Sequence, residues 1–166
     1  MPPAMPSPHP SPTLHPPKPH DDGALSQAPA EMVYTISLIN DLAELRRMSE
    51  WLERSGRALG IAPQRLSELE LCANEAVTNV ISYAYDAPGA RRIGLRLARS
   101  GEAASLTLED DGKPFDPTAA ALPVPPVSLE QAQIGGLGIK LIRSMMAHCA
   151  YRRGDGKNLF TMTTHA

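Results

Sequence analysis

The stretch from residue 93 to residue 109, IGLRLARSGEAASLTLE, decides the fold class. Two runs rich in apolar and strand-favouring residues, 93–98 and 105–109, flank a Ser100-Gly101 pair. A serine followed by a glycine is a turn signal, so the two runs are predicted to form a β-hairpin. Strands that are joined by a short turn run antiparallel, so the sheet is predicted to be mostly antiparallel.

A strand and a helix are predicted before this hairpin. Polar and apolar residues tend to alternate over 34–39, a pattern that is typical of a half-buried strand. Asn40 or Asp41 can then cap a helix, because a short polar side chain accepts a hydrogen bond from a free backbone N–H. Apolar residues follow at helical spacing: Leu42, Leu45, Met48 and Leu52. Gly56 and Gly60 are expected to end this helix.

The remaining elements complete an α+β pattern. Pro63 suits the first turn of a second helix, which is predicted to run to about Tyr85. After the hairpin we expect a helix over 138–147, strands over 149–151 and 159–163, and a turn at 154–156. The order β-α-α-β-β-α-β-β groups the strands in hairpins. It predicts an α+β fold, a two-layer sandwich with helices on one face of a mixed, mostly antiparallel sheet.

Composition changes once along the chain. Residues 1–30 hold ten of the 17 prolines and few apolar side chains to bury. They are predicted to form a disordered proline-rich tail, with a docking motif for a partner domain as the alternative. Residues 31–166 contain no internal repeat and are predicted to form one domain.

Charge and cysteine usage exclude several classes of protein. The formal net charge of the 166-residue chain is -2 with both signs interspersed, so direct binding of nucleic acid is not expected. No run approaches the roughly 18 consecutive apolar residues of a membrane helix, so no membrane association is expected. Cys72 and Cys149 are too few for a disulfide framework and lack the clustered spacing of a zinc site. The composition predicts a cytoplasmic protein.

The second helix carries the first candidate site. Glu75 and Asn79 lie one turn apart and are expected to point the same way. Asn79 has small and apolar neighbours, where a side-chain amide needs a hydrogen-bond partner. A carboxylate and an amide at this spacing could serve as a proton acceptor and a hard-metal ligand. The alternative is a solvated polar helix face.

Two further segments could hold a ligand. In residues 106–117, LTLEDDGKPFDP, a strand runs into acidic residues and a glycine. This would place Asp110 at the mouth of the sheet. The alternative is an ordinary turn. In residues 134–142, IGGLGIKLI, glycines open an apolar helix whose free amides favour an anion, unless they only cap the helix. Residues 113–133 between them are long enough for a lid.

Together these three segments resemble the N, G1 and G2 boxes of the GHKL ATPases. The matching residues are 75–79 (EAVTN), 110–117 (DDGKPFDP) and 135–139 (GGLGI). More narrowly, the chain resembles the bacterial anti-sigma-factor serine/threonine kinases of the partner-switching type. The resemblance covers essentially all of residues 32–166, and it implies the GHKL ATPase fold.

The resemblance implies a role for each of three polar residues. Glu75 would be the general base that accepts a proton from the attacking hydroxyl. Asn79 would bind the magnesium ion that bridges the ATP phosphates. Asp110 would accept a hydrogen bond from the adenine amino group.

Three glycines have implied roles as well. Gly112 would let the backbone lie against the base, while Gly136 and Gly138 would cradle the phosphates at the start of a helix. The lid segment contains no arginine, so a cation for the transferring phosphate would come from Lys140, Arg143 or a partner.

The implied function is that of an ATP-dependent serine/threonine protein kinase. It would phosphorylate a STAS-domain anti-anti-sigma protein and would alternately hold a sigma factor or that antagonist. The resemblance also allows a homodimer through the sheet or the first helix. Two alternatives are a non-catalytic ATP-binding module that sequesters a sigma factor or other partner, and the catalytic domain of a sensor histidine kinase.

Overall fold

The computed structural model describes residues 32–87, 89–119 and 136–166. The predicted tail and most of the predicted lid lie outside these residues. Within them the strands and helices follow the predicted order: β1 (Val33–Ile39), α1 (Glu44–Ala58), α2 (Pro63–Tyr83), β2 (Arg92–Ser100), β3 (Ala103–Asp110), α3 (Gly136–Met145), β4 (His148–Gly154) and β5 (Lys157–Thr163). None of the helices in this part of the chain is both long and apolar enough to cross a bilayer.

The five strands form one sheet in the order β1-β2-β3-β5-β4. The α+β class is confirmed, but the sheet is not mixed, because all four strand pairings are antiparallel. The hairpins β2–β3 and β4–β5 impose this direction on their own strands. α3 then returns the chain so that β5, rather than β4, pairs with β3.

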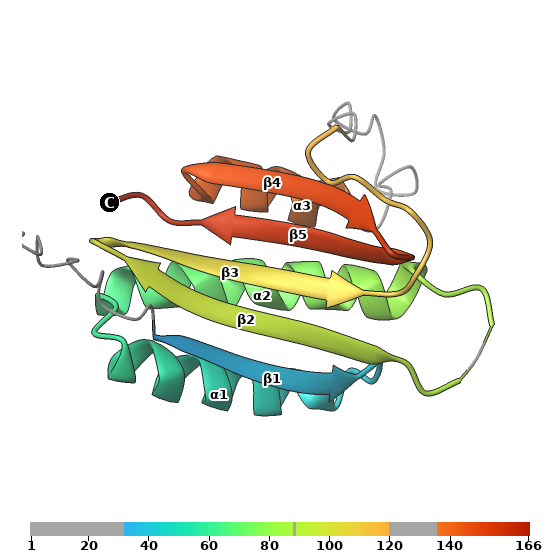
Figure 1. Ribbon diagram of the computed structural model, residues 1–166, viewed down its shortest axis with the longest axis horizontal. Helices are drawn as coiled ribbons and strands as arrows, with labels where there is room; N and C mark the ends of the chain where they lie inside the picture. The colour runs from blue at the N-terminus through green and yellow to red at the C-terminus, as the bar shows by residue number, and fades with distance from the viewer. Residues whose placement is uncertain (1–31, 88, 120–135) are drawn as a thin grey trace, which may run out of the picture. The chain divides into compact units, whose positions relative to one another are not determined.

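The three helices cover one face of the sheet (Figure 1). α1 packs on β1 and β2, and α2 packs on β3 and on both other helices. Apolar side chains from both layers meet between them and form one core cluster. Its largest fully buried members include Leu38, Met48, Leu52, Leu69, Ile93, Leu97, Leu106, Ile142 and Met162.

The first helix differs from the prediction at its start and at Gly56, whereas Gly60, directly after the C-cap Leu59 and with a φ of 66°, ends it as predicted. Asn40 does not cap it, because its Oδ1 accepts the Arg91 N–H at 2.8 Å, and Asp41 instead accepts the N–H of Ala43 before the helix begins. Gly56 lies inside α1 and does not end it. A Cβ at position 56 would collide with the Leu66 side chain, so this glycine allows the close packing of α1 on α2.

The third helix is shifted, while the last hairpin lies where it is predicted and has longer strands. α3 ends at Met145, two residues before the predicted end, because the N–H of Ala147 already donates to Thr163 O and begins the β4–β5 ladder. The turn of that hairpin is where the sequence predicts it. Asp155 and Gly156 adopt φ values of 51° and 76°, the backbone of a tight two-residue hairpin turn.

Arg99 links the end of α1 to the β2–β3 turn. Its Nη1 donates to Leu59 O at 2.9 Å and to Gly60 O at 2.8 Å, and its Nε donates to Gly101 O at 2.7 Å. The guanidinium therefore satisfies carbonyl groups that the helix end leaves without intrahelical partners.

Replacing Arg99 by alanine should destabilise the fold. Hydrogen bonds to a charged group contribute about 1.5–3 kcal/mol, and we expect the Arg99→Ala variant to lose about that much free energy of unfolding. Urea unfolding followed by circular dichroism measures the change. Arg57→Ala is the control, because in the described part of the chain the Arg57 side chain forms an exposed ion pair with Glu53, and losing it should cost less than about 0.5 kcal/mol. Equal losses for the two variants would contradict the role of Arg99.

Candidate functional site

Glu75 and Gly138 are brought together by the packing of α2 on α3. Glu75 lies in the middle of α2, and Gly138 lies in the first turn of α3. A Cβ at position 138 would overlap Glu75 Oε2 and lie 3.3 Å from Glu75 Cδ. The missing side chain at Gly138 therefore lets the carboxylate rest in this position against the start of α3, where free backbone N–H groups favour negative charge. Gly136 is the first residue of α3.

Asn79 lies one turn farther along α2. Its Nδ2 is buried and has no hydrogen-bond partner among the described residues. A buried polar group without a partner costs about 1–3 kcal/mol, so such a group is usually found where a ligand or an ordered water completes it. The sequence predicts that this amide needs a partner, because its neighbours in the helix are small and apolar.

Asp110 ends β3 and is 4% exposed. The described residues donate two hydrogen bonds to it, from Gly112 N–H at 2.8 Å and from Asn158 Nδ2 at 2.9 Å, and both go to Oδ1. Oδ2 is therefore the oxygen that a ligand can use as an acceptor.

Gly112 allows the loop after β3 to touch the end of α2. A Cβ there would lie 2.5 Å from Ala84 Cβ and 2.8 Å from Ala84 O. Lys113 strengthens the junction, because its N–H donates to Ala84 O at 2.8 Å and its Nζ pairs with Asp86 at 2.7 Å. The described contacts thus assign Gly112 a packing role, while its approach to a base stays a prediction.

Tyr85 follows directly after this junction. Its hydroxyl oxygen is buried without a hydrogen-bond partner among the described residues, and the Arg91 guanidinium lies 5.7 Å from its ring centroid. Burial, with the negative charges of Asp110 and Asp111, raises the pKa of Tyr85 above its usual value. The side chain therefore stays neutral at physiological pH and keeps a hydroxyl proton to donate.

Asn158 is the site residue that sequence reasoning misses. It is 5% exposed on β5, in register with Asp110, and its Nδ2 also donates to Lys113 O at 2.9 Å. Its alternation with the buried Phe160 and Met162 shows that residue 158 faces the core. An amide at an inward strand position is the same signal that identified Asn79 on its helix.

The helix α2 separates the two halves of this site by a fixed length. Glu75 meets Gly138 near the middle of the helix, and Ala84 meets Gly112 at its end. Nine residues at a rise of ~1.5 Å place these contacts about 14 Å apart along the axis. An elongated ligand with an anionic end at Glu75 and a hydrogen-bonding end at Asp110 matches this spacing better than a compact one.

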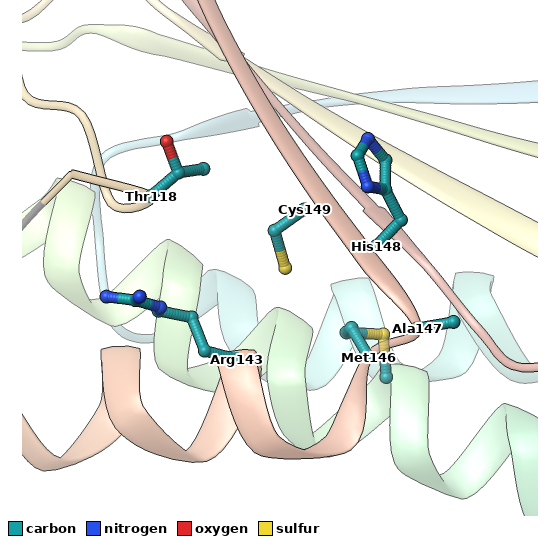
Figure 2. Close-up of a pocket in the computed structure, with 6 residues that line it drawn as sticks. All are labelled: Thr118, Arg143, Met146, Ala147, His148 and Cys149. Atoms are coloured by element: carbon teal, nitrogen blue, oxygen red, sulfur yellow. The ribbon is translucent and has the colours of Figure 1, made fainter.

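A separate hollow of about 240 Å³ lies between α3 and β4 (Figure 2). The described residues that line it are Thr118, Arg143, Met146, Ala147, His148 and Cys149, of which the sequence analysis considers Arg143 alone, as a cation for the phosphate. Arg143 extends into it toward Thr118 (Figure 2). Five positions separate Arg143 from Gly138, about 140° around the helix, so this cation points away from the side of α3 that Glu75 contacts. Lys140 is exposed.

The side chains present fit a magnesium–nucleotide complex better than a metal held by protein alone. The described residues contain no group of three or more His, Cys, Asp or Glu side chains that could hold a metal ion. The atom of Asn79 that lacks a partner is Nδ2, a hydrogen-bond donor that suits a phosphate oxygen, so a cation would be held by its Oδ1, with Glu75 one turn away. Oxygen donors of this kind suit Mg²⁺, which usually completes its coordination with phosphate and water oxygens.

Known proteins resemble this chain in sequence and in fold. It is 40% identical over 98 residues to the serine/threonine-protein kinase BtrW of Bordetella bronchiseptica, an alignment that covers 59% of this chain and 69% of that protein. The solved RsbU and RsbW domains of Rv1364c from Mycobacterium tuberculosis share the fold, with a TM-score of 0.54 and 15% identity. This match covers 81% of the chain but only 32% of that longer protein.

A family model for the histidine kinase-like ATPase domain matches residues 38–164. This match runs from the buried Leu38 of β1 to Thr164 after β5, so it includes every helix and both hairpins. The resemblance to the GHKL ATPases is confirmed by it. The chain belongs to the histidine kinase-like ATPase domain family.

Proposed function

We propose that the protein is an ATP-dependent serine/threonine protein kinase of the anti-sigma type. The observation that carries this proposal is the position of the Glu75 carboxylate against the first turn of α3, with the unpaired amide of Asn79 one turn away. The chain's 40% identity to a serine/threonine-protein kinase supports it. A site for ATP is proposed along α2, with the phosphates at Glu75 and the base at Asp110.

The base end would recognise adenine through hydrogen bonds. Asp110 Oδ2 would accept from the exocyclic amino group, since Oδ1 is already used by Gly112 and Asn158. The hydroxyl of Tyr85 is buried and interacts electrostatically with Asp110 and Asp111, so it would be a further donor at this end of the site. Gly112 would let the loop backbone lie against the base.

The phosphate end would combine helix amides with a cation. Gly136 and Gly138 would present the amides that open α3, and the missing side chains allow a phosphate to approach. Asn79 would hold Mg²⁺. When bound, this ion neutralises charge on the phosphate oxygens.

Glu75 would then act as the general base. It would take the proton from the serine or threonine hydroxyl of the acceptor protein as the hydroxyl oxygen forms its bond to the γ-phosphorus. The bond from that phosphorus to the bridging oxygen breaks, and ADP leaves with the electron pair. Positioning and charge neutralisation supply most of the acceleration in phosphoryl transfer, and here the helix amides and Glu75 would supply the positioning and the ion held by Asn79 the neutralisation.

The acceptor would be a STAS-domain anti-anti-sigma protein, and a sigma factor would be the alternate partner. This part of the proposal rests on the resemblance of the three boxes to partner-switching kinases and on the fold shared with a protein that contains an RsbW domain. Such a switch would work in the cytoplasm, where ATP and sigma factors are present, and would contact neither DNA nor a membrane directly. A homodimer through the sheet or the first helix would be compatible with it.

Asp110→Asn should weaken the binding of ATP. A hydrogen bond to a charged group contributes about 1.5–3 kcal/mol, so we expect the Kd for Mg·ATP to rise roughly 10- to 150-fold. Isothermal titration calorimetry measures the change. Glu109→Gln is the matched control, because this preceding carboxylate lies on the opposite face of β3 and forms a surface ion pair with Lys157. Unchanged affinity in Asp110→Asn, with the wild type binding ATP, would place the base elsewhere.

Glu75→Gln should remove phosphoryl transfer and leave ATP binding largely intact. A general base contributes about 10²–10⁴-fold, so transfer of labelled phosphate to a STAS-domain acceptor protein should fall by that factor. Glu68→Gln, two turns earlier on the same helix, should leave the rate unchanged.

The outcome also separates the kinase from the non-catalytic alternative. Bound ATP without transfer in the wild type, and the same partner affinity in Glu75→Gln, would favour a module that only sequesters its partner.

A further inference from the structure

A row of polar side chains crosses three strands at the base end of the site. Asp110 on β3 is in register with Asn158 on β5, and Asn158 is in register with Arg153 on the edge strand β4. Tyr151 lies two residues before Arg153 and on the same face of the strand. The proposed adenine ligand is therefore connected to an edge hairpin that is distant from it in sequence.

The orientation of the Asn158 amide is fixed from the β4 side. Its Oδ1 accepts from Arg153 Nη1 at 2.5 Å and from the Tyr151 hydroxyl at 2.9 Å. A guanidinium has donors only, so the oxygen of the amide must face it. If the amide turned over, its NH₂ group would face Arg153, and its oxygen would face the acceptors Asp110 Oδ1 and Lys113 O. Arg153 and Tyr151 thus select one of the two orientations.

Arg153 also holds the loop itself. Its Nη1 donates to Gly112 O at 3.1 Å, next to the point where this loop meets Ala84. The carboxylate of Asp110 and the backbone that follows it are therefore positioned by the same guanidinium, once directly and once through Asn158.

We propose that Arg153 and Tyr151 are positioning residues that set the base preference of the nucleotide site. The inference rests on the proposed ATP site. With the amide fixed, Asn158 and Gly112 direct their N–H donors to Asp110 Oδ1, and Oδ2 is left as an acceptor. Adenine offers an amino group to an acceptor at this place, whereas guanine offers a carbonyl oxygen at the equivalent ring position. Two acceptors that face each other without water are unfavourable, so guanine is rejected.

The test compares Mg·ATP and Mg·GTP binding to the full-length protein by calorimetry. In Arg153→Met the guanidinium donors are lost, while an unbranched stem that fills the inner part of the side chain's volume is kept. We expect the Kd for ATP to rise by about tenfold or more and the Kd for GTP to change by less than about threefold, so that the preference for ATP falls. Arg152→Met is the matched control. Arg152 is the preceding residue and points to the opposite face of β4, so its variant should keep both affinities.

A purely structural role would give a different result. Since both nucleotides carry the same phosphates, a loosened fold would weaken ATP and GTP equally, and this outcome overturns the inference. An unchanged preference in Arg153→Met, or a wild type that binds both nucleotides alike, overturns it as well. A wild type that binds neither nucleotide contradicts the proposed ATP site itself.

Tyr151→Phe keeps the test decisive if Arg153→Met does not fold. This change removes a single hydroxyl and leaves the ring in place. A neutral hydrogen bond corresponds to about a two- to tenfold effect, so the preference for ATP should fall by that factor. The melting temperature of each variant, measured without nucleotide, identifies any that are unfolded. A folded Tyr151→Phe protein with the wild-type preference overturns the part assigned to Tyr151.

Discussion

The close approach of two glycines to α2 is the constraint on which the candidate site depends. At one point Gly138 lets α3 lie against the Glu75 carboxylate, and at the other Gly112 lets the loop after β3 lie against Ala84. The helix between these contacts is rigid, because its backbone hydrogen bonds fix the rise per residue. The phosphate end and the base end of the proposed site are therefore held at one separation, whatever the lid segment between them does.

Buried polar groups then determine what this frame can hold. At the base end, the Asn158 amide donates a hydrogen bond to Asp110 and accepts one from Arg153 on the edge strand. The amide of Asn79 and the hydroxyl of Tyr85 keep buried atoms without partners in the described part of the chain. Leaving such groups unpaired is costly, so the paired groups define the walls of the site and the unpaired ones indicate where a ligand binds.

Much of the fold was predictable because local rules decide it. Turn residues and alternation identified both hairpins, and Pro63 marked the start of α2. The errors occurred where tertiary packing overrides a local signal. Gly56 looks like the end of a helix but is used for the contact with Leu66, and the side chain of Asn40 pairs with Arg91 instead of capping α1. The regular antiparallel sheet also depends on pairing β3 with β5, a contact between strands that are distant in the sequence.

The sequence by itself determined the order of the elements and the family resemblance, because periodicity, turn residues and the three boxes are local patterns. It also indicated Glu75, Asn79 and Asp110 as chemically significant residues. Only the tertiary structure decided that Glu75 lies against Gly138, that Gly112 packs on Ala84, and that Asn158 and Arg153 support Asp110. These contacts join residues from 28 to 63 positions apart in the printed sequence, and strand register and helix packing alone bring them within reach of one another.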